Sequence, residues 1–66
     1  MKISLNGETV DVRDAKTIGE LIERYQLSPQ SILVEHNGLA VHHREWSERA
    51  LAEGDRIELV RVVAGG

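Results

Sequence analysis

The sequence contains no cysteine and no phenylalanine among its 66 residues. A chain without thiols forms no disulfide, no thiolate metal site and no cysteine nucleophile. With one Trp and one Tyr as the only large aromatic residues, the core must be small and aliphatic. A chain of this length buries only about 60% of its unfolded surface, which leaves little room for an enclosed substrate pocket of about 300 Å³ or more. We therefore expect a single domain, residues 1–66, that is not an enzyme by itself.

Basic clusters and long apolar runs are also lacking. The formal net charge is −3 and acidic and basic residues are interspersed, so we expect no nucleic-acid partner, because such binding draws on clustered Lys and Arg. No apolar run approaches the roughly 20 residues of a membrane span. The turn residues Asn6-Gly7 come too early for the apolar region of a signal peptide. We expect a cytoplasmic protein that does not bind membranes.

The first twelve residues have the pattern of a β-hairpin. Ile3 and Leu5 alternate with polar residues before Asn6-Gly7, and Val10 and Val12 alternate with polar residues after it. Asn-Gly supplies the two positive-φ positions of a type I′ turn. We interpret Asn6-Gly7 as turn chemistry only.

A helix is predicted from about Ile18 to Gln26. Thr17 and Glu20 have the spacing of a capping box, and apolar residues follow at helical spacing: Ile18, Leu21, Ile22 and Tyr25. Ser28-Pro29 should end the helix, because proline disfavours helical geometry in the residue before it. Gly19 costs up to about 1 kcal/mol relative to Ala in a helix, and close packing of the first turn on a sheet would explain it.

The second half of the chain predicts three more strands. Ile32–Glu35 is an aliphatic run that stops at the turn residues Asn37-Gly38, and Leu39–Val41 forms a short return strand. Ser47 is expected to cap a short helical turn through Leu51. After a turn at residues 53–55, alternation resumes at Arg56 and runs to the end of the chain. The order is strand, strand, helix, strand, short strand, strand, which is an α+β fold.

Three histidines are the remaining side-chain candidates for a site: His36, His42 and His43. Neighbouring residues on a strand point to opposite faces, and zinc sites usually need three or four placed ligands, so we predict no metal site. The sequence shows no Ser, His and Asp set that stands out as a triad and no Gly-rich phosphate loop. Trp46 is expected to pack in or at the rim of the core.

By elimination, the chemistry lies at the carboxyl terminus. The alternating run from Leu59 ends on Gly65-Gly66, and residues without Cβ atoms can pass through a narrow channel. A carboxylate is a poor electrophile, but adenylation by ATP turns it into a mixed anhydride that a sulfur or amine nucleophile attacks. We predict that Gly66 carries the reactive carboxyl and that Ala64 and Gly65 thread it into an enzyme. The tail, about residues 61–66, should be flexible, and mobile from about Val63.

The chain resembles a known family. It is similar to the ThiS family, the sulfur carriers of bacterial thiamine biosynthesis, within the ubiquitin-like β-grasp proteins. The resemblance lies in five stretches: Ile3–Glu8, Thr17–Ile22, Val34–Gly38 with Val41 and Trp46 after it, Leu51–Glu58, and Val62–Gly66. It implies a mixed sheet of four to five strands packed on one helix, with a flexible C-terminal Gly-Gly tail.

The resemblance also implies partners. A ThiF-like adenylyltransferase of the ubiquitin-activating type would use ATP to form an acyl-adenylate on Gly66. A cysteine desulfurase system would supply the sulfur that converts it to a thiocarboxylate, and thiazole synthase would take the sulfur. The carrier itself would bind no cofactor. Aliphatic residues near the tail, Val60, Val62 and Val63, are the candidates for docking these partners.

Other functions remain open. A carrier with the same mechanism could serve molybdopterin or cysteine synthesis, although the short chain and the Val-Ala-Gly-Gly ending favour thiamine. A protein of another class could be a non-catalytic binding module, or a ubiquitin-like modifier that forms isopeptide bonds. Deleting Gly66 separates the carriers from a binding module.

Overall fold

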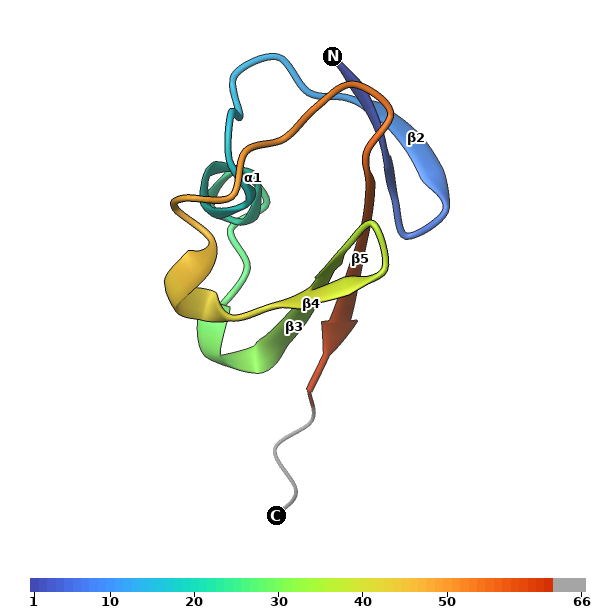
Figure 1. The fold of residues 1–66 in the computed structure, drawn as a ribbon. Coiled ribbons are helices and arrows are strands. Elements are labelled where there is room, and N and C mark those ends of the chain that lie inside the picture. The colour runs from blue at the N-terminus through green and yellow to red at the C-terminus, as the bar shows by residue number, and fades with distance from the viewer. Residues whose placement is uncertain (63–66) are drawn as a thin grey trace.

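A computed structural model describes residues 1–62 of the chain. The elements follow in the order β1 (Lys2–Leu5), β2 (Glu8–Asp11), α1 (Ile18–Arg24), η1 (Pro29–Ser31), β3 (Ile32–His36), β4 (Leu39–Val41), η2 (His43–Glu45) and β5 (Arg56–Arg61), where η denotes a 3₁₀ turn. The strands form one five-stranded sheet in the order β2-β1-β5-β3-β4. β1 and β5 are parallel and the other neighbours are antiparallel. The predicted order of strands and helix along the chain and the predicted mixed sheet are confirmed (Figure 1).

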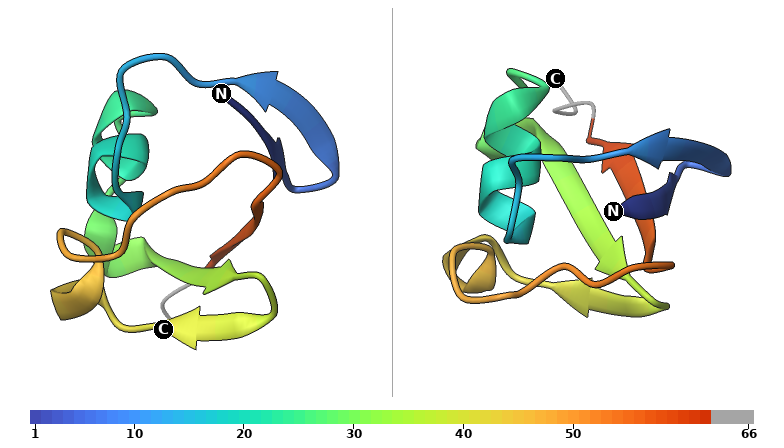
Figure 2. Two further views of the ribbon diagram at one scale, coloured as in Figure 1. Left: turned by 45° about the horizontal axis from the view of Figure 1, so that its top comes forward. Right: turned by 90° about the horizontal axis from the view of Figure 1, so that it is seen from above.

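The helix α1 packs on one face of the sheet, and the core lies between them (Figure 2). The buried apolar residues are Ile3, Val12, Ala15, Ile18, Leu21, Ile22, Ile32, Val34, Val41, Trp46, Leu51 and Ile57. The segment after η2 runs beside the start of the helix, where Thr17 and Ala50 form an isolated β-bridge. No helix among residues 1–62 has the length and apolar character of a membrane span.

The helix begins where the sequence predicts and ends earlier. The Thr17 side chain accepts a hydrogen bond from the Glu20 amide at 3.2 Å, which caps the first turn. The last helical residue is Arg24, because Gln26 adopts a left-handed φ of 56° and stops the helical path. Pro29 therefore begins η1 and does not end α1.

The predicted helical turn from Ser47 to Leu51 is wrong. The 3₁₀ turn η2 lies earlier, at His43–Glu45. Its start is fixed by His42, whose amide donates to the Glu45 carboxylate at 3.2 Å. A capping pair is therefore present, but it uses His42 and Glu45 instead of Ser47.

Gly19 packs against a loop and not against the sheet. Its amide donates to the Trp46 carbonyl at 2.9 Å, and a Cβ atom there would lie 3.4 Å from the backbone of Trp46 and Ser47. The Trp46 side chain is buried and its Nε1 donates to the Val41 carbonyl at 3.2 Å. The prediction that Trp46 packs in the core is confirmed, and Gly19 allows the helix to approach it closely.

Candidate functional site

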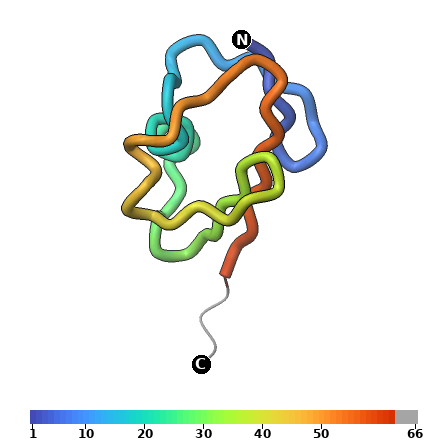
Figure 3. Tube along the Cα trace, viewed as in Figure 1, coloured from blue at the N-terminus to red at the C-terminus, as the bar shows by residue number. Residues whose placement is uncertain are grey.

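Strand β5 leads directly to the predicted reactive tail. In the chain trace it runs from the end of the molecule that holds the N-terminus toward the opposite end (Figure 3). Among the predicted site residues, Val60 lies in β5 and Val62 follows it. Gly66, Gly65, Ala64 and Val63 lie outside the described residues, so their roles stay predictions. The structure describes the strand that precedes these four residues.

Two Asn-Gly turns hold β5 in place. Asn6 accepts a hydrogen bond from the Leu59 amide through its Oδ1 at 2.7 Å, and Asn37 accepts one from the Arg56 amide at 2.8 Å. The φ angles of these residues, 50° for Asn6 and 52° for Asn37, agree with the predicted turns. The sequence interpretation of Asn6-Gly7 as turn chemistry alone is incomplete, because each Asn side chain also anchors the strand that carries the tail.

Asp55, just before β5, is the centre of a buried polar network and is only 9% exposed. Its Oδ2 accepts from His36 Nε2 at 2.7 Å and from the Ala52 amide at 2.8 Å. Its Oδ1 accepts from Asn37 Nδ2 at 3.1 Å. Arg49 Nε donates to His36 Nδ1 at 3.4 Å, which adds Arg49 to the same network.

Burial raises the pKa of the Asp55 carboxyl, but the hydrogen bonds from His36, Asn37 and Ala52 outweigh burial. The pKa of Asp55 therefore lies below its usual value of 3.8, and the carboxylate stays charged. Sequence reasoning missed this network, since residues 53–55 indicate only a turn. The network is a structural anchor at the start of β5.

The histidines have separate surroundings. His36 belongs to the Asp55 network, His42 precedes η2, and the His43 ring lies against Trp46 with 4.6 Å between ring centroids. Over residues 1–62, no three His, Cys, Asp or Glu side chains come together in a group that could hold a metal ion.

The other end of β5 has an exposed apolar surface. Val60 is 50% exposed and Leu33 is 61% exposed, and the two are direct partners across β5 and β3. Val62 is 42% exposed and its amide donates to the Ser31 carbonyl at 2.7 Å. With exposed Ala40 on β4, these residues form what we call the outer face: Leu33, Ala40, Val60 and Val62. Val60 and Val62 thus lie at the surface, and their role in partner binding stays a prediction.

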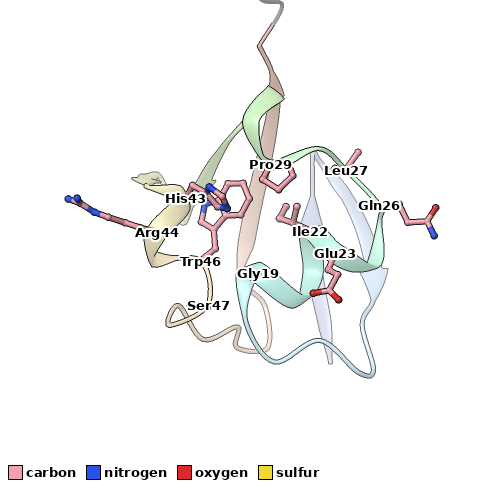
Figure 4. A pocket seen from close by; sticks show the side chains of 10 residues that line it. All are labelled: Gly19, Ile22, Glu23, Gln26, Leu27, Pro29, His43, Arg44, Trp46 and Ser47. Carbon is pink, nitrogen blue, oxygen red and sulfur yellow. The ribbon is translucent and has the colours of Figure 1, made fainter.

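A hollow of about 690 Å³ lies between α1 and η2. Its apolar lining includes Ile22, Leu27 and Trp46, and Figure 4 shows the Arg44 and Gln26 side chains directed away from it. The sequence predicts little room for an enclosed pocket, and this hollow is an open depression over the closed core. No sequence signal located it.

The chain is similar to known sulfur carriers over its whole length. The ThiS family model matches residues 3–66. The sulfur carrier protein ThiS of Bacillus subtilis is 35% identical over 65 residues, which cover 97% of this chain and 98% of that protein. The ThiS protein of Escherichia coli is 27% identical over 66 residues and 100% of both chains.

A thiazole synthase of Magnetococcus marinus is 33% identical over 100% of this chain, but the chain spans only 20% of the length of that protein. The crystal structure of ThiS from Geobacter metallireducens has a TM-score of 0.83 over 100% of both chains at 23% identity. This likeness confirms the predicted ubiquitin-like β-grasp fold. Because the family model covers all but the first two residues, the chain belongs to the ThiS family.

Proposed function

We propose that this protein is a sulfur carrier of thiamine biosynthesis. A ThiF-like adenylyltransferase transfers AMP from ATP to the carboxyl group of Gly66 and releases pyrophosphate. The persulfide of a cysteine desulfurase system then attacks the acyl-adenylate and displaces AMP, which gives an acyl disulfide. A thiol cleaves the S–S bond of this intermediate and is itself oxidised to a disulfide, so that a thiocarboxylate remains on Gly66. Thiazole synthase takes the sulfur, and the carboxylate returns to the cycle. The chain is a co-substrate of these enzymes and not a catalyst, and it binds no cofactor.

The observation that carries this proposal is the extent of the family match. The match runs to residue 66, so it includes Gly65-Gly66. Two proteins named as sulfur carriers match essentially from end to end. A relative named as a thiazole synthase contains a segment similar to the whole chain, which supports that enzyme as the partner that receives the sulfur.

The hydrogen bonds that hold β5 and the residues near its end support this role. Asp55 and Asn37 fix the start of β5, and Asn6 bonds to the amide of Leu59 farther along the strand, so β5 presents the following residues from a fixed position. Small residues at Ala64 and Gly65 suit passage into a narrow active site. Val60 and Val62, with Val63 outside the described residues, supply apolar contacts for docking.

The test is activation by a purified adenylyltransferase encoded in the same genome. Deletion of Gly66, or addition of one residue after it, should abolish ATP-dependent pyrophosphate release and leave the urea unfolding midpoint unchanged. A variant with one residue added before Met1 is the matched control and should be activated normally. Normal activation of the Gly66 deletion would contradict the proposal.

The pathway is tested in cells. Loss of the gene should create a growth requirement for thiamine. A requirement for cysteine, or loss of molybdopterin-dependent activity, would instead assign the same carrier chemistry to another pathway.

A further inference from the structure

The two Asn-Gly turns are chemically reactive as well as structural. Asn6-Gly7 joins β1 to β2, and Asn37-Gly38 joins β3 to β4. The backbone nitrogen of the residue after an asparagine can attack the side-chain amide carbon, and glycine hinders this attack least because it has no Cβ atom. Ammonia leaves, and the amide becomes a carboxylate. By sequence alone, the two turns should react equally.

The backbone of the two turns is almost identical. The φ angle is 50° at Asn6 and 52° at Asn37, and the glycine that follows each has a φ of 86°. Both turns are exposed and lie at the periphery of the molecule (Figure 2). A Cβ atom on either glycine would have no heavy atom beyond its chain neighbours within 4 Å, so both turns have room to open. Backbone geometry and exposure therefore do not distinguish the two asparagines.

Two contacts to β5 are also matched in the two turns. The Asn6 backbone amide donates to the Ile57 carbonyl at 2.9 Å, and Asn6 Oδ1 accepts from the Leu59 amide at 2.7 Å. The Asn37 backbone amide donates to the Arg56 carbonyl at 2.7 Å, and Asn37 Oδ1 accepts from the Arg56 amide at 2.8 Å. Each side-chain oxygen is therefore held in the same way.

The nitrogen of the side-chain amide is held in one turn only. Asn37 Nδ2 donates to the carboxylate of buried Asp55 at 3.1 Å, whereas Asn6 Nδ2 forms no hydrogen bond within residues 1–62. This nitrogen is the atom that leaves as ammonia, and the amide must rotate toward the glycine nitrogen before it leaves. Asn37 must therefore break a bond to a charged group that Asn6 does not have, and such bonds are stronger than those between neutral groups.

We propose that Asn6 is a site of spontaneous deamidation in the folded protein and that Asp55 protects Asn37 from the same reaction. The Gly7 nitrogen forms a bond to Asn6 Cγ, the Cγ–Nδ2 bond breaks, and the proton of the Gly7 amide leaves with that nitrogen as ammonia. The product is a cyclic succinimide. Water then opens one of the two C–N bonds of this ring, which gives either aspartate or isoaspartate at position 6.

The two products differ in their effect on β5. Aspartate keeps a carboxylate oxygen in place to accept from the Leu59 amide. Isoaspartate carries the main chain through its Cβ and Cγ atoms, so the turn gains one backbone carbon and the carboxylate moves. The hydrogen bond to the Leu59 amide is then lost. Deamidation is therefore a slow route by which an aged chain loosens the strand that precedes its carboxyl terminus.

Peptide mass mapping of the wild type during incubation at mildly alkaline pH tests the proposal. Deamidation makes a peptide heavier by the difference between a hydroxyl and an amino group. In the folded protein, the peptide that contains Asn6 should gain this mass about tenfold faster than the peptide that contains Asn37. In urea that unfolds the chain, the two rates should become similar. No gain at Asn6 in the folded protein would overturn the site, and an equal or faster gain at Asn37 would overturn its protection.

Asp55→Ala tests the source of the protection. This variant should raise the rate at Asn37 and leave the rate at Asn6 unchanged, because Asn6 in the same chain would also react faster if the whole structure were lost. The matched control is Asp14→Ala, which removes an exposed carboxylate and should change neither rate. An unchanged rate at Asn37 in Asp55→Ala would overturn the role of Asp55.

Hydrogen exchange on the aged protein tests the effect on β5. The isoaspartate form is identified with an isoaspartyl methyltransferase and separated from the unmodified chain. Its Leu59 amide should exchange faster than in the unmodified chain, while the Arg56 amide, which bonds to Asn37, should keep its rate. Unchanged exchange at Leu59 would overturn the link to β5. None of these measurements requires activation by an adenylyltransferase, so their outcome is independent of the proposed function.

Discussion

The two ends of strand β5 differ in what surrounds them. At the start, the side chain of Asn37 donates a hydrogen bond to buried Asp55 and accepts one from the Arg56 amide. Every buried side-chain nitrogen and oxygen atom among residues 1–62 has a hydrogen-bond partner. At the other end, Val60 and Val62 are half exposed and apolar. The first end makes hydrogen bonds within the protein, and the second leaves apolar surface uncovered.

We expect this difference to separate the residues of β5 that stabilise the fold from those that bind a partner. Contacts at the start of β5 should control the free energy of unfolding, because loss of a partner leaves a buried polar group unsatisfied. Contacts at the end should control binding, because an exposed side chain contributes little to folding. Substitutions at the two ends of β5 should therefore differ in their effect on the free energy of unfolding, with the largest effect at the start of the strand.

The largest loss is expected for Asp55→Ala, which removes the acceptor for His36, Asn37 and the Ala52 amide. We expect the free energy of unfolding, measured with urea, to fall by about 3 kcal/mol. The control is Asp14→Ala, since Asp14 is an exposed carboxylate 3.3 Å from Arg24, and it should cost under about 0.5 kcal/mol. Equal losses in the two variants would refute the anchoring role of Asp55.

The same anchor should weaken in acid. Because the pKa of Asp55 is lowered in the folded protein, its charge adds stability above the unfolded-state pKa of about 3.9, and this stability is lost as the pH falls through the lower folded-state value. The difference in unfolding free energy between the wild type and Asp55→Asn should therefore be constant near neutral pH and shrink below about pH 4. A difference that stays constant in acid would contradict the assignment.

A smaller loss is expected for Asn6→Gly. Glycine keeps the positive φ of the turn but removes the acceptor for the Leu59 amide, so the unfolding free energy should fall by about 1 kcal/mol. Gln26→Gly is the matched control, since Gln26 also has a positive φ and its side chain forms no hydrogen bond within residues 1–62. That variant should be neutral or slightly stabilising. Loss of stability in both variants alike would mean that backbone freedom, and not the lost bond, sets the cost.

The smallest effect on stability is expected for Val60→Thr. The Val60 side chain is half exposed, and threonine keeps the β-branched shape that suits a strand. The free energy of unfolding should therefore change by less than about 0.5 kcal/mol. Binding to thiazole synthase should nevertheless weaken, as measured by calorimetry. A large loss of stability would place Val60 with the anchored end and remove the distinction between the two ends.

Local patterns in the sequence predict most of the elements, because the strand and helix periods are carried by neighbouring residues. The hairpin at Asn6-Gly7 and the helix start at Thr17 follow from such patterns. The end of the helix at Arg24 does not follow from a local pattern. Gln26 adopts a left-handed φ, and glutamine is not a residue type that indicates this conformation. The position of η2 was missed because Ser47 is a more usual cap than His42.

Long-range contacts account for what sequence reasoning missed at the site. The Asn6 side chain bonds to an amide 53 residues away, and Asp55 bonds to His36 across 19 residues. Both Asn6 and Asp55 indicate only turns when read locally. The exposed position of Leu33 beside Val60 was also missed, because it follows from the pairing of β3 with β5. The role of Gly66 was predicted from the chemistry of its carboxyl group, and it lies outside the described residues.

The most direct test of the central claim is the intact mass of the protein recovered from cells grown without thiamine. The account predicts a species heavier by the difference between one sulfur and one oxygen atom, with the change on the C-terminal peptide that contains Gly66. An unmodified mass, together with no adenylate on Gly66 after incubation with the purified adenylyltransferase and ATP, would contradict it.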